Sequence, residues 1–163
     1  MRKLYIKMCE KAKEIQKEWQ PQEGDKFAFK KDLNKTNFVF QSTLDDVKNT
    51  EIIIAVDGLI IEKKSVIWLP YQHQLQEMVC EAKYTRLWWI SKFYKPKEKI
   101  PIILLFQDFE EFLEKEIFPT KNINYSAEEL WLIYVMKRKY NKIWNKIKKE
   151  WEEIKNENTK KIN

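Results

Sequence analysis

The segment EIIIAVDGLIIEKKSVIWLP, residues 51–70, decides the fold of this chain. Two runs of β-branched residues flank the dipeptide Asp57-Gly58, and such a dipeptide between apolar runs is among the strongest short signals for a β-hairpin. The pattern predicts two antiparallel strands, over residues 51–56 and 59–69. Pro70 ends the second strand and suits the first turn of a following helix.

The sequence before this hairpin predicts one helix and two more strands. Apolar residues repeat at helical spacing over residues 3–18 and Pro21 follows, which predicts the first helix. Two short apolar segments, KFAF (26–29) and NFVF (37–40), predict further strands of the same sheet. The segment STLDDVKN, residues 42–49, begins like a capped helix and predicts a short helical turn.

The sequence after the hairpin predicts mostly helices. Residues 71–82 carry an apolar face at helical spacing. Residues 84–94 fit either a continuation of that helix or an aromatic strand. The run IILLF (102–106) predicts a buried strand, and residues 108–118 predict a helix that follows it.

The last helix has the clearest signal. Ser126 and Glu129 have the spacing of a capping box, and apolar residues then repeat every three or four positions as far as Ile154. We therefore expect an α+β fold: a small antiparallel β-sheet with packed helices and a long amphipathic C-terminal helix. We expect a single domain over residues 1–155 and a disordered basic tail over residues 156–163.

The net charge of +6 is concentrated at one end of the chain. Residues 137–163 hold ten basic and four acidic side chains, whereas the rest of the chain is balanced. A basic helix there could bind the phosphates of a nucleic acid, and a solvated face in a lysine-rich chain explains the same charges. The four lysines that would contact phosphate are Lys139, Lys142, Lys146 and Lys149.

The glycine content excludes two classes of enzyme. The chain has two glycines, Gly24 and Gly58, and both lie in predicted turns. A phosphate-binding loop or a dinucleotide-binding turn needs glycine where the backbone approaches phosphate closely. The sequence therefore predicts neither.

The sequence also argues against nucleophilic catalysis. His73 is the only histidine, and Cys80 lies seven residues further along the same predicted helix, about 10 Å away. That separation is too large for an activated Cys–His pair. Cys9 and Cys80 are too few for a disulfide framework or a zinc site. We expect no enzymatic activity and no cofactor.

A magnesium-dependent nuclease is the one enzymatic alternative. Such an enzyme needs two carboxylates for Mg²⁺ and usually a lysine. Glu62 and Lys64 lie on one side of a predicted strand, with Asp57 or Asp46 as the second carboxylate. A solvated strand edge explains the same pair.

A candidate ligand-binding surface starts in the segment VIWLPYQHQLQEMV, residues 66–79, and continues into the aromatic and basic segment 84–97. Amide and imidazole groups can read the polar edges of a base, and aromatic rings with nearby cations can bind nucleotide rings and phosphates. Core packing is the competing explanation for the aromatic residues. The candidate contacts are Tyr71, Gln72, His73, Gln76, Arg86 and Trp89.

Three blocks of the sequence resemble a known group of proteins. They are WQPQEGD (19–25), WLP with QLQEM (68–78), and LWL with Val135-Met136, Tyr140 and Trp144. Together they resemble small uncharacterised phage and prophage proteins of Gram-positive bacteria, over roughly residues 1–145. The blocks mark core and turns. The resemblance implies a mobile-element setting, in which small accessory proteins often act by binding.

The favoured hypothesis is therefore a non-enzymatic phage accessory protein. It could act in counter-defence, either by blocking a host defence protein or by sequestering a phosphate-bearing nucleotide signal. The N-terminus lacks an apolar run long enough for a signal peptide, and no apolar stretch reaches the ~20 residues of a membrane span. We expect a location in the cytoplasm of the bacterial host and no membrane partner.

Overall fold

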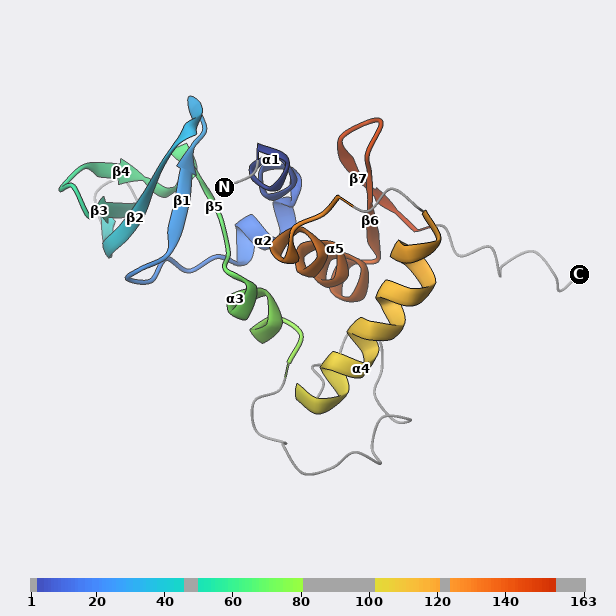
Figure 1. Cartoon of the computed structure of the whole chain (residues 1–163). Coiled ribbons are helices and arrows are strands. Elements are labelled where there is room, and N and C mark those ends of the chain that lie inside the picture. The colour runs from blue at the N-terminus through green and yellow to red at the C-terminus, as the bar shows by residue number, and fades with distance from the viewer. Residues whose placement is uncertain (1–2, 46–49, 81–101, 121–123, 155–163) are drawn as a thin grey trace, which may run out of the picture. The chain divides into compact units, whose positions relative to one another are not determined.

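The computed structural model describes residues 3–45, 50–80, 102–120 and 124–154 (Figure 1). The chain divides into two compact units, Met1–Gln74 and Leu75–Asn163. The single domain expected over residues 1–155 stays a prediction, and the predicted tail at 156–163 lies outside the described residues. Within the described residues, the helices are too short or too polar to cross a membrane.

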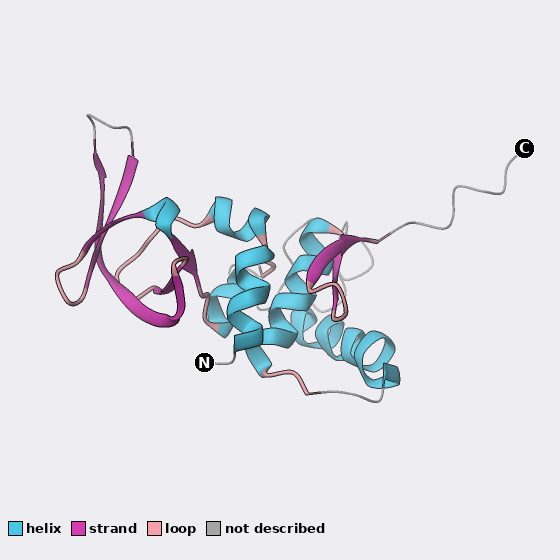
Figure 2. Cartoon of the chain, turned by 90° about the horizontal axis from the view of Figure 1, so that it is seen from above, coloured by secondary structure: helices cyan, strands magenta, loops and turns pink. Residues whose placement is uncertain are grey.

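The first unit is built on a five-stranded antiparallel sheet in the order β4-β3-β2-β1-β5. Strands β1 to β4 follow one another as a meander, and β5 returns to pair with β1. Figure 2 shows the strong curl of this sheet. The strands are β1 (Lys26–Phe29), β2 (Asp32–Asp45), β3 (Thr50–Ala55), β4 (Ile60–Glu62) and β5 (Val66–Trp68).

The predicted hairpin is confirmed. Strands β3 and β4 pair antiparallel, with Ile53 opposite Ile61. In the turn between them, Gly58 has a φ of 79°, a conformation that a residue with a β-carbon rarely adopts. The backbone N–H of Leu59 donates to Oδ1 of Asp57 at 3.2 Å, so the aspartate stabilises the turn with its own side chain.

Two local predictions for this sheet are wrong. The strand expected over 59–69 is interrupted by a 3-10 turn at Lys63–Ser65, which separates β4 from β5 and lets β5 pair with β1 instead. Ser42 and Asp45 belong to β2, where they pair with Ile53 and Thr50 of β3, rather than to a helical turn. Cross-strand pairing gives these backbone groups partners that one isolated helical turn cannot supply. Residues 46–49 lie outside the described residues.

The helix predicted over 3–18 is two helices, α1 (Lys3–Lys11) and α2 (Lys13–Glu18). The break falls at Ala12, with φ −81° and ψ 68°. The side-chain amide of Gln16 in α2 then bridges the two helices and the sheet. It donates to the carbonyl oxygens of Cys9 at 3.2 Å and Trp68 at 3.0 Å, and accepts from the Trp68 N–H at 2.8 Å.

Buried Asp25 joins the first two blocks of the resemblance. Its Oδ2 accepts from the indole N–H of Trp19 at 2.7 Å and from the backbone N–H of Gln22 at 2.9 Å. Its Oδ1 accepts from the amide of Gln74. The ring of Trp19 stacks on that of Trp68, with centroids 5.8 Å apart and planes 4° apart. These contacts place Trp19, Asp25 and Trp68 in the core of the first unit.

The described residues of the second unit form two long helices and a small hairpin. Helix α4 (Ile102–Phe112) continues through a π-helical turn (Leu113–Ile117) into a 3-10 turn (Phe118–Thr120). Helix α5 (Ala127–Tyr140) is followed by strands β6 (Lys142–Asn145) and β7 (Glu150–Glu153), which pair with each other. A further short helix, α3 (Gln72–Glu77), spans the boundary between the two units.

The strand predicted for IILLF is wrong, because these residues lie in α4. A short apolar run fits a buried helix segment as well as a buried strand. Here Leu105 and Phe112 are buried along α4. The ring of Phe109 stacks on Trp131 of α5, with centroids 3.9 Å apart. The helix places these side chains on one apolar face against α5.

The last helix begins where predicted but ends earlier. The capping box is present: the Glu129 N–H donates to Oγ of Ser126 at 3.3 Å, and the Ser126 N–H donates to Oε2 of Glu129 at 2.8 Å. The helix ends at Tyr140 rather than Ile154, because Asn141 adopts a left-handed conformation with φ 56°. The α+β class with an antiparallel sheet and packed helices is confirmed, whereas the predicted extent of the C-terminal helix is wrong.

We expect Asn141→Ala to lower the free energy of unfolding by about 1 kcal/mol, because a left-handed alanine is strained. The variant also loses the bond from the Asn141 side-chain amide to the Ile154 carbonyl at 3.1 Å. Asn141→Gly relieves the backbone strain and should lose less. Urea unfolding of the three proteins measures the difference. Equal stability of the alanine variant and the wild type would contradict this account of the helix end.

Tyr134 gives the second unit a specific pH dependence. Its hydroxyl donates to Oδ2 of Asp108, which also lies 3.2 Å from Nη1 of Arg138. Burial, and then the hydrogen bond to Asp108, raise the pKa of Tyr134 well above its ordinary value of 10.0. In the unfolded chain the phenol ionises near pH 10, so above that pH the unfolded state binds fewer protons than the folded state.

The contribution of Tyr134 to the free energy of unfolding should therefore be complete below pH 10, and it should fall as the pH rises further. In Tyr134→Phe this component of the decline is absent. Urea unfolding at several pH values between about 9 and 11 compares the two slopes. Identical slopes for wild type and variant would show that Tyr134 ionises equally well in the folded protein.

Candidate functional site

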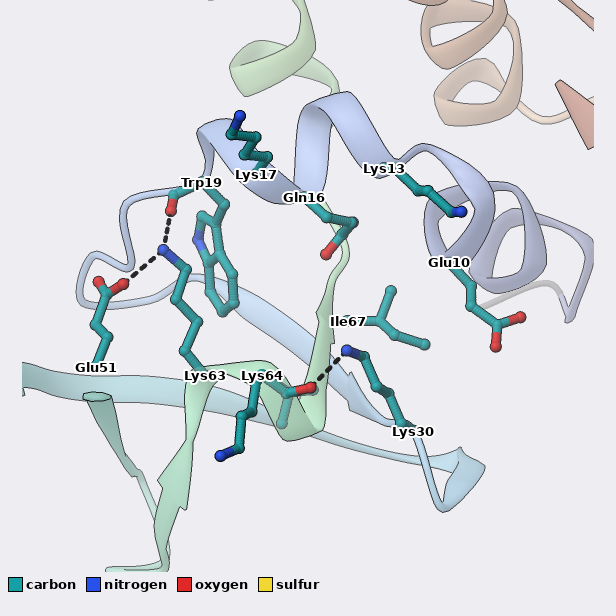
Figure 3. Close-up of a pocket in the computed structure, with 11 residues that line it drawn as sticks. Glu10, Lys13, Gln16, Lys17, Trp19, Lys30, Glu51, Lys63, Lys64 and Ile67 are labelled. Carbon is teal, nitrogen blue, oxygen red and sulfur yellow. Dashed lines mark hydrogen bonds and ion pairs between the residues drawn. The ribbon is translucent and has the colours of Figure 1, made fainter. Parts of the chain in front are cut away.

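A pocket of about 580 Å³ lies in the first unit, between helices α1 and α2 and the 3-10 turn that precedes β5 (Figure 3). Its volume is in the range typical of small-molecule sites. Five of the side chains around it are lysines. The lining residues are Glu10, Lys13, Gln16, Lys17, Trp19, Lys30, Glu51, Lys63, Lys64, Val66 and Ile67.

Internal ion pairs compensate part of this charge. Lys63 Nζ lies 2.6 Å from Oε2 of Glu51 and also donates to the Trp19 carbonyl. Lys64 Nζ lies 3.0 Å from Oε2 of Glu62. The carboxylate of Glu10 is 2.7 Å from the ammonium of Lys7, outside the pocket lining. Both acidic side chains of the pocket therefore already have a cationic partner.

Three lysines of the pocket remain uncompensated. The side chains of Lys13 and Lys17 of α2 make no hydrogen bond or ion pair with any residue of the described ranges, and both are exposed. Lys30, in the turn between β1 and β2, donates to the carbonyl oxygen of Lys64, which carries no charge. Figure 3 shows Lys13 and Lys17 on the α2 side of the pocket, with Lys17 pointing outward, and Lys30 on the opposite side with its ammonium toward the Lys64 carbonyl. The pocket therefore carries a local excess of positive charge that an anionic ligand can neutralise.

The other lining residues give the pocket its shape. Trp19 is 3% exposed and stacked on Trp68, so it forms a wall rather than a free surface for stacking. The amide of Gln16 already uses both N–H groups and its oxygen on backbone groups. Val66 and Ile67 of β5 add apolar contact area. Ammonium groups are the main polar donors that the pocket offers to a ligand.

The predicted ligand-binding residues that the structure describes do not line this pocket. Tyr71, Gln72 and His73 lie near the end of the first unit, where the rings of Tyr71 and His73 stack with centroids 5.7 Å apart. Gln76 belongs to the second unit. Two of the predicted contacts, Arg86 and Trp89, lie outside the described residues.

Gln74, which was not among the predicted contacts, has a structural role. Its amide donates to Asp25, and its Oε1 accepts from the backbone N–H of Tyr71 at 2.8 Å. The surface around Tyr71 stays a prediction.

The four lysines of the nucleic-acid hypothesis do not share a helix. Lys139 lies in α5, Lys142 in β6, and the other two in the turn between β6 and β7. Lys139 Nζ lies 5.3 Å from the centroid of the Tyr140 ring, and Lys146 Nζ lies 4.3 Å from that of Tyr125. The continuous basic helix on which this hypothesis was built is therefore wrong.

The described residues of the nuclease hypothesis take part in separate local contacts. Glu62 at the end of β4 pairs with Lys64. Asp57 accepts a hydrogen bond within the hairpin turn, and Asp46 lies outside the described residues. No group of three or more histidine, cysteine or acidic side chains that could hold a metal ion occurs in the described part of the chain.

Sequence reasoning missed the pocket lysines because they come from separate segments. Lys13 and Lys17 are four apart on a short helix, which is an ordinary spacing in a chain with 31 basic residues. Lys30 and the 3-10 turn reach the same pocket only through the pairing of β5 with β1. Comparison adds no further guide: no protein-family model, no curated protein and no solved structure matches this chain.

Proposed function

We propose that this protein is a non-enzymatic binding protein whose lysine-lined pocket takes a phosphate-bearing small molecule. The observation that carries the proposal is the set of three uncompensated ammonium groups, on Lys13, Lys17 and Lys30, around one pocket of about 580 Å³. The resemblance to phage proteins favours an accessory role, in which the protein sequesters a nucleotide signal of the host.

The charge and size of the pocket favour a phosphate ester over a simple carboxylate. A phosphate monoester carries about −1.5 to −2 charges at pH 7 and several strong acceptor oxygens. Lysine binds such a group as a point charge. The pocket is in the size range of sites for whole small molecules, so there is room for the organic part of a nucleotide beside Val66 and Ile67.

The lining favours binding over turnover. Among the described residues that line the pocket, none has a hydroxyl, thiol or imidazole side chain that could act as a nucleophile or a base in the usual way. Its two carboxylates, on Glu10 and Glu51, are held in ion pairs. A protein with this pocket acts by binding its ligand without converting it.

Thermal unfolding of the intact chain with a panel of nucleoside monophosphates, nucleoside diphosphates and dinucleotides tests this function. A ligand at one hundred times its Kd stabilises the folded state by about 2.7 kcal/mol, which raises Tm measurably. We expect a rise with at least one phosphate-bearing compound. We also expect its loss in the triple variant Lys13→Gln, Lys17→Gln and Lys30→Gln, and recovery of the compound unchanged by mass spectrometry.

A control variant removes positive charges next to the pocket without changing the residues that line it. Lys11 of α1 and Lys31 of the β1–β2 turn are exposed neighbours that do not line the pocket. The double variant Lys11→Gln and Lys31→Gln should keep the full Tm rise. A flat result across the panel would contradict the proposal and favour a protein target. A rise that the triple variant retains would place the binding site elsewhere.

A further inference from the structure

We propose that the ligand of this pocket carries two anionic groups at separated positions rather than one group or two adjacent ones. This inference rests on the proposed function and deepens it. The uncompensated charges stand on opposite rims of the pocket: Lys13 and Lys17 on α2, and Lys30 in the β1–β2 turn (Figure 3).

Each rim can bind an anion of its own without breaking an existing contact. The ammonium of Lys30 is held on its own rim by the carbonyl of Lys64. An ammonium has three N–H donors, so Lys30 can bind an anion on this rim while it keeps that bond. The two α2 lysines stay on the other rim, because they project from a helix that Gln16 fixes to the sheet.

Among the described side chains, those between the rims offer no uncompensated cation. Both N–H groups of the Gln16 amide are used by the carbonyls of Cys9 and Trp68. The ammonium of Lys63 is held by Glu51 and by the Trp19 carbonyl. An anionic group placed midway would meet no uncompensated cation among these side chains. The pocket therefore selects a ligand with an uncharged middle and an anionic group toward each rim.

The chemical class that meets this requirement is a nucleotide with two phosphates attached at different positions of its sugar or sugars. Adenosine 3′,5′-bisphosphate is the simplest probe of this class. Adenosine 5′-monophosphate supplies one phosphate on the same nucleoside. Adenosine 5′-diphosphate supplies two phosphates that are adjacent, so it controls for charge without separation.

Isothermal titration calorimetry of the intact chain with these three compounds, at low salt and without divalent metal, tests the inference. We expect adenosine 3′,5′-bisphosphate to bind about tenfold tighter than either of the other two, as one additional charge-assisted contact would give. Lys30→Gln and the double variant Lys13→Gln and Lys17→Gln should each reduce this advantage to less than about threefold. Lys31→Gln, as the matched control, should preserve it.

Two results would overturn the inference while the proposed function stands. One is equal binding of the diphosphate and the bisphosphate, which would show that total charge and not separation is recognised. The other is an equal loss for all three compounds in Lys30→Gln, which would place one phosphate against both rims. If none of the three compounds binds, the proposed function itself fails with these probes, and that result is distinct from the other two.

Discussion

Replacing Asp25 with alanine is expected to lower the free energy of unfolding by about 3 kcal/mol, because three donors lose the buried carboxylate that accepts from them. Asp25 is 3% exposed and accepts from the Trp19 indole, the Gln22 backbone and the Gln74 amide. The free energy of unfolding from urea titration, followed by tryptophan fluorescence, measures the loss.

Two further variants sharpen this test. Glu23→Ala changes an exposed acidic residue in the same turn and should alter the free energy of unfolding by less than about 0.5 kcal/mol. Asp25→Asn keeps an acceptor oxygen for the Trp19 indole and should fall between the two. If Asp25→Ala is as stable as Glu23→Ala, the carboxylate does not hold this turn to the core, and the wall of the pocket formed by Trp19 has another support.

Trp131→Ala is expected to have an effect at least as large on the second unit. Trp131 of α5 is 3% exposed, and its ring stacks on Phe109 of α4 with planes 8° apart. It also meets Tyr134 edge to face at 5.6 Å between centroids. Removal of a buried aromatic side chain costs about 3–5 kcal/mol, because the cavity it leaves closes only in part.

The matched control for Trp131 is Phe118→Ala, because Phe118 is an aromatic residue of the same unit that is 53% exposed. Its loss should be below about 1 kcal/mol. The measurement is chemical unfolding of both variants, with far-ultraviolet circular dichroism to follow the helices. Similar losses for the two variants would contradict the packing of α4 on α5 through Trp131.

The parts of the fold that follow from the sequence are those fixed by local chemistry. Asp57-Gly58 predicts its hairpin because few other residues tolerate that turn, and Ser126 with Glu129 predicts the start of α5 because the two side chains satisfy each other's backbone. Neither signal depends on distant residues. Both predictions are confirmed.

The wrong predictions arise where two structures fit one pattern. Trp144 and Trp151 fit a helical stripe, yet they face each other across β6 and β7, with ring centroids 5.1 Å apart. The helix was expected to continue because Asn141, which ends it, is only a weak stop signal in sequence. The run IILLF was ambiguous in the same way, since its burial depends on α5, which follows it in the chain.

The candidate site could not be predicted because it depends on tertiary structure and on the balance of charges. Lys63 and Lys30 look alike in sequence, and only the structure shows that Glu51 compensates the first and a neutral carbonyl holds the second. The predicted surface at Tyr71 drew on residue types that bind nucleotides in general. Residue type alone does not show which ammonium groups remain available.

The most direct test of the central claim is a titration of isotope-labelled chain with adenosine 3′,5′-bisphosphate, observed by two-dimensional nuclear magnetic resonance of the backbone amides. We predict saturable shifts at residues 13–17, 30 and 63–67, the segments that carry the pocket lysines. Shifts confined to residues 139–149 or 71–73, or no shifts at all, would contradict the assignment of the lysine-lined pocket as the binding site.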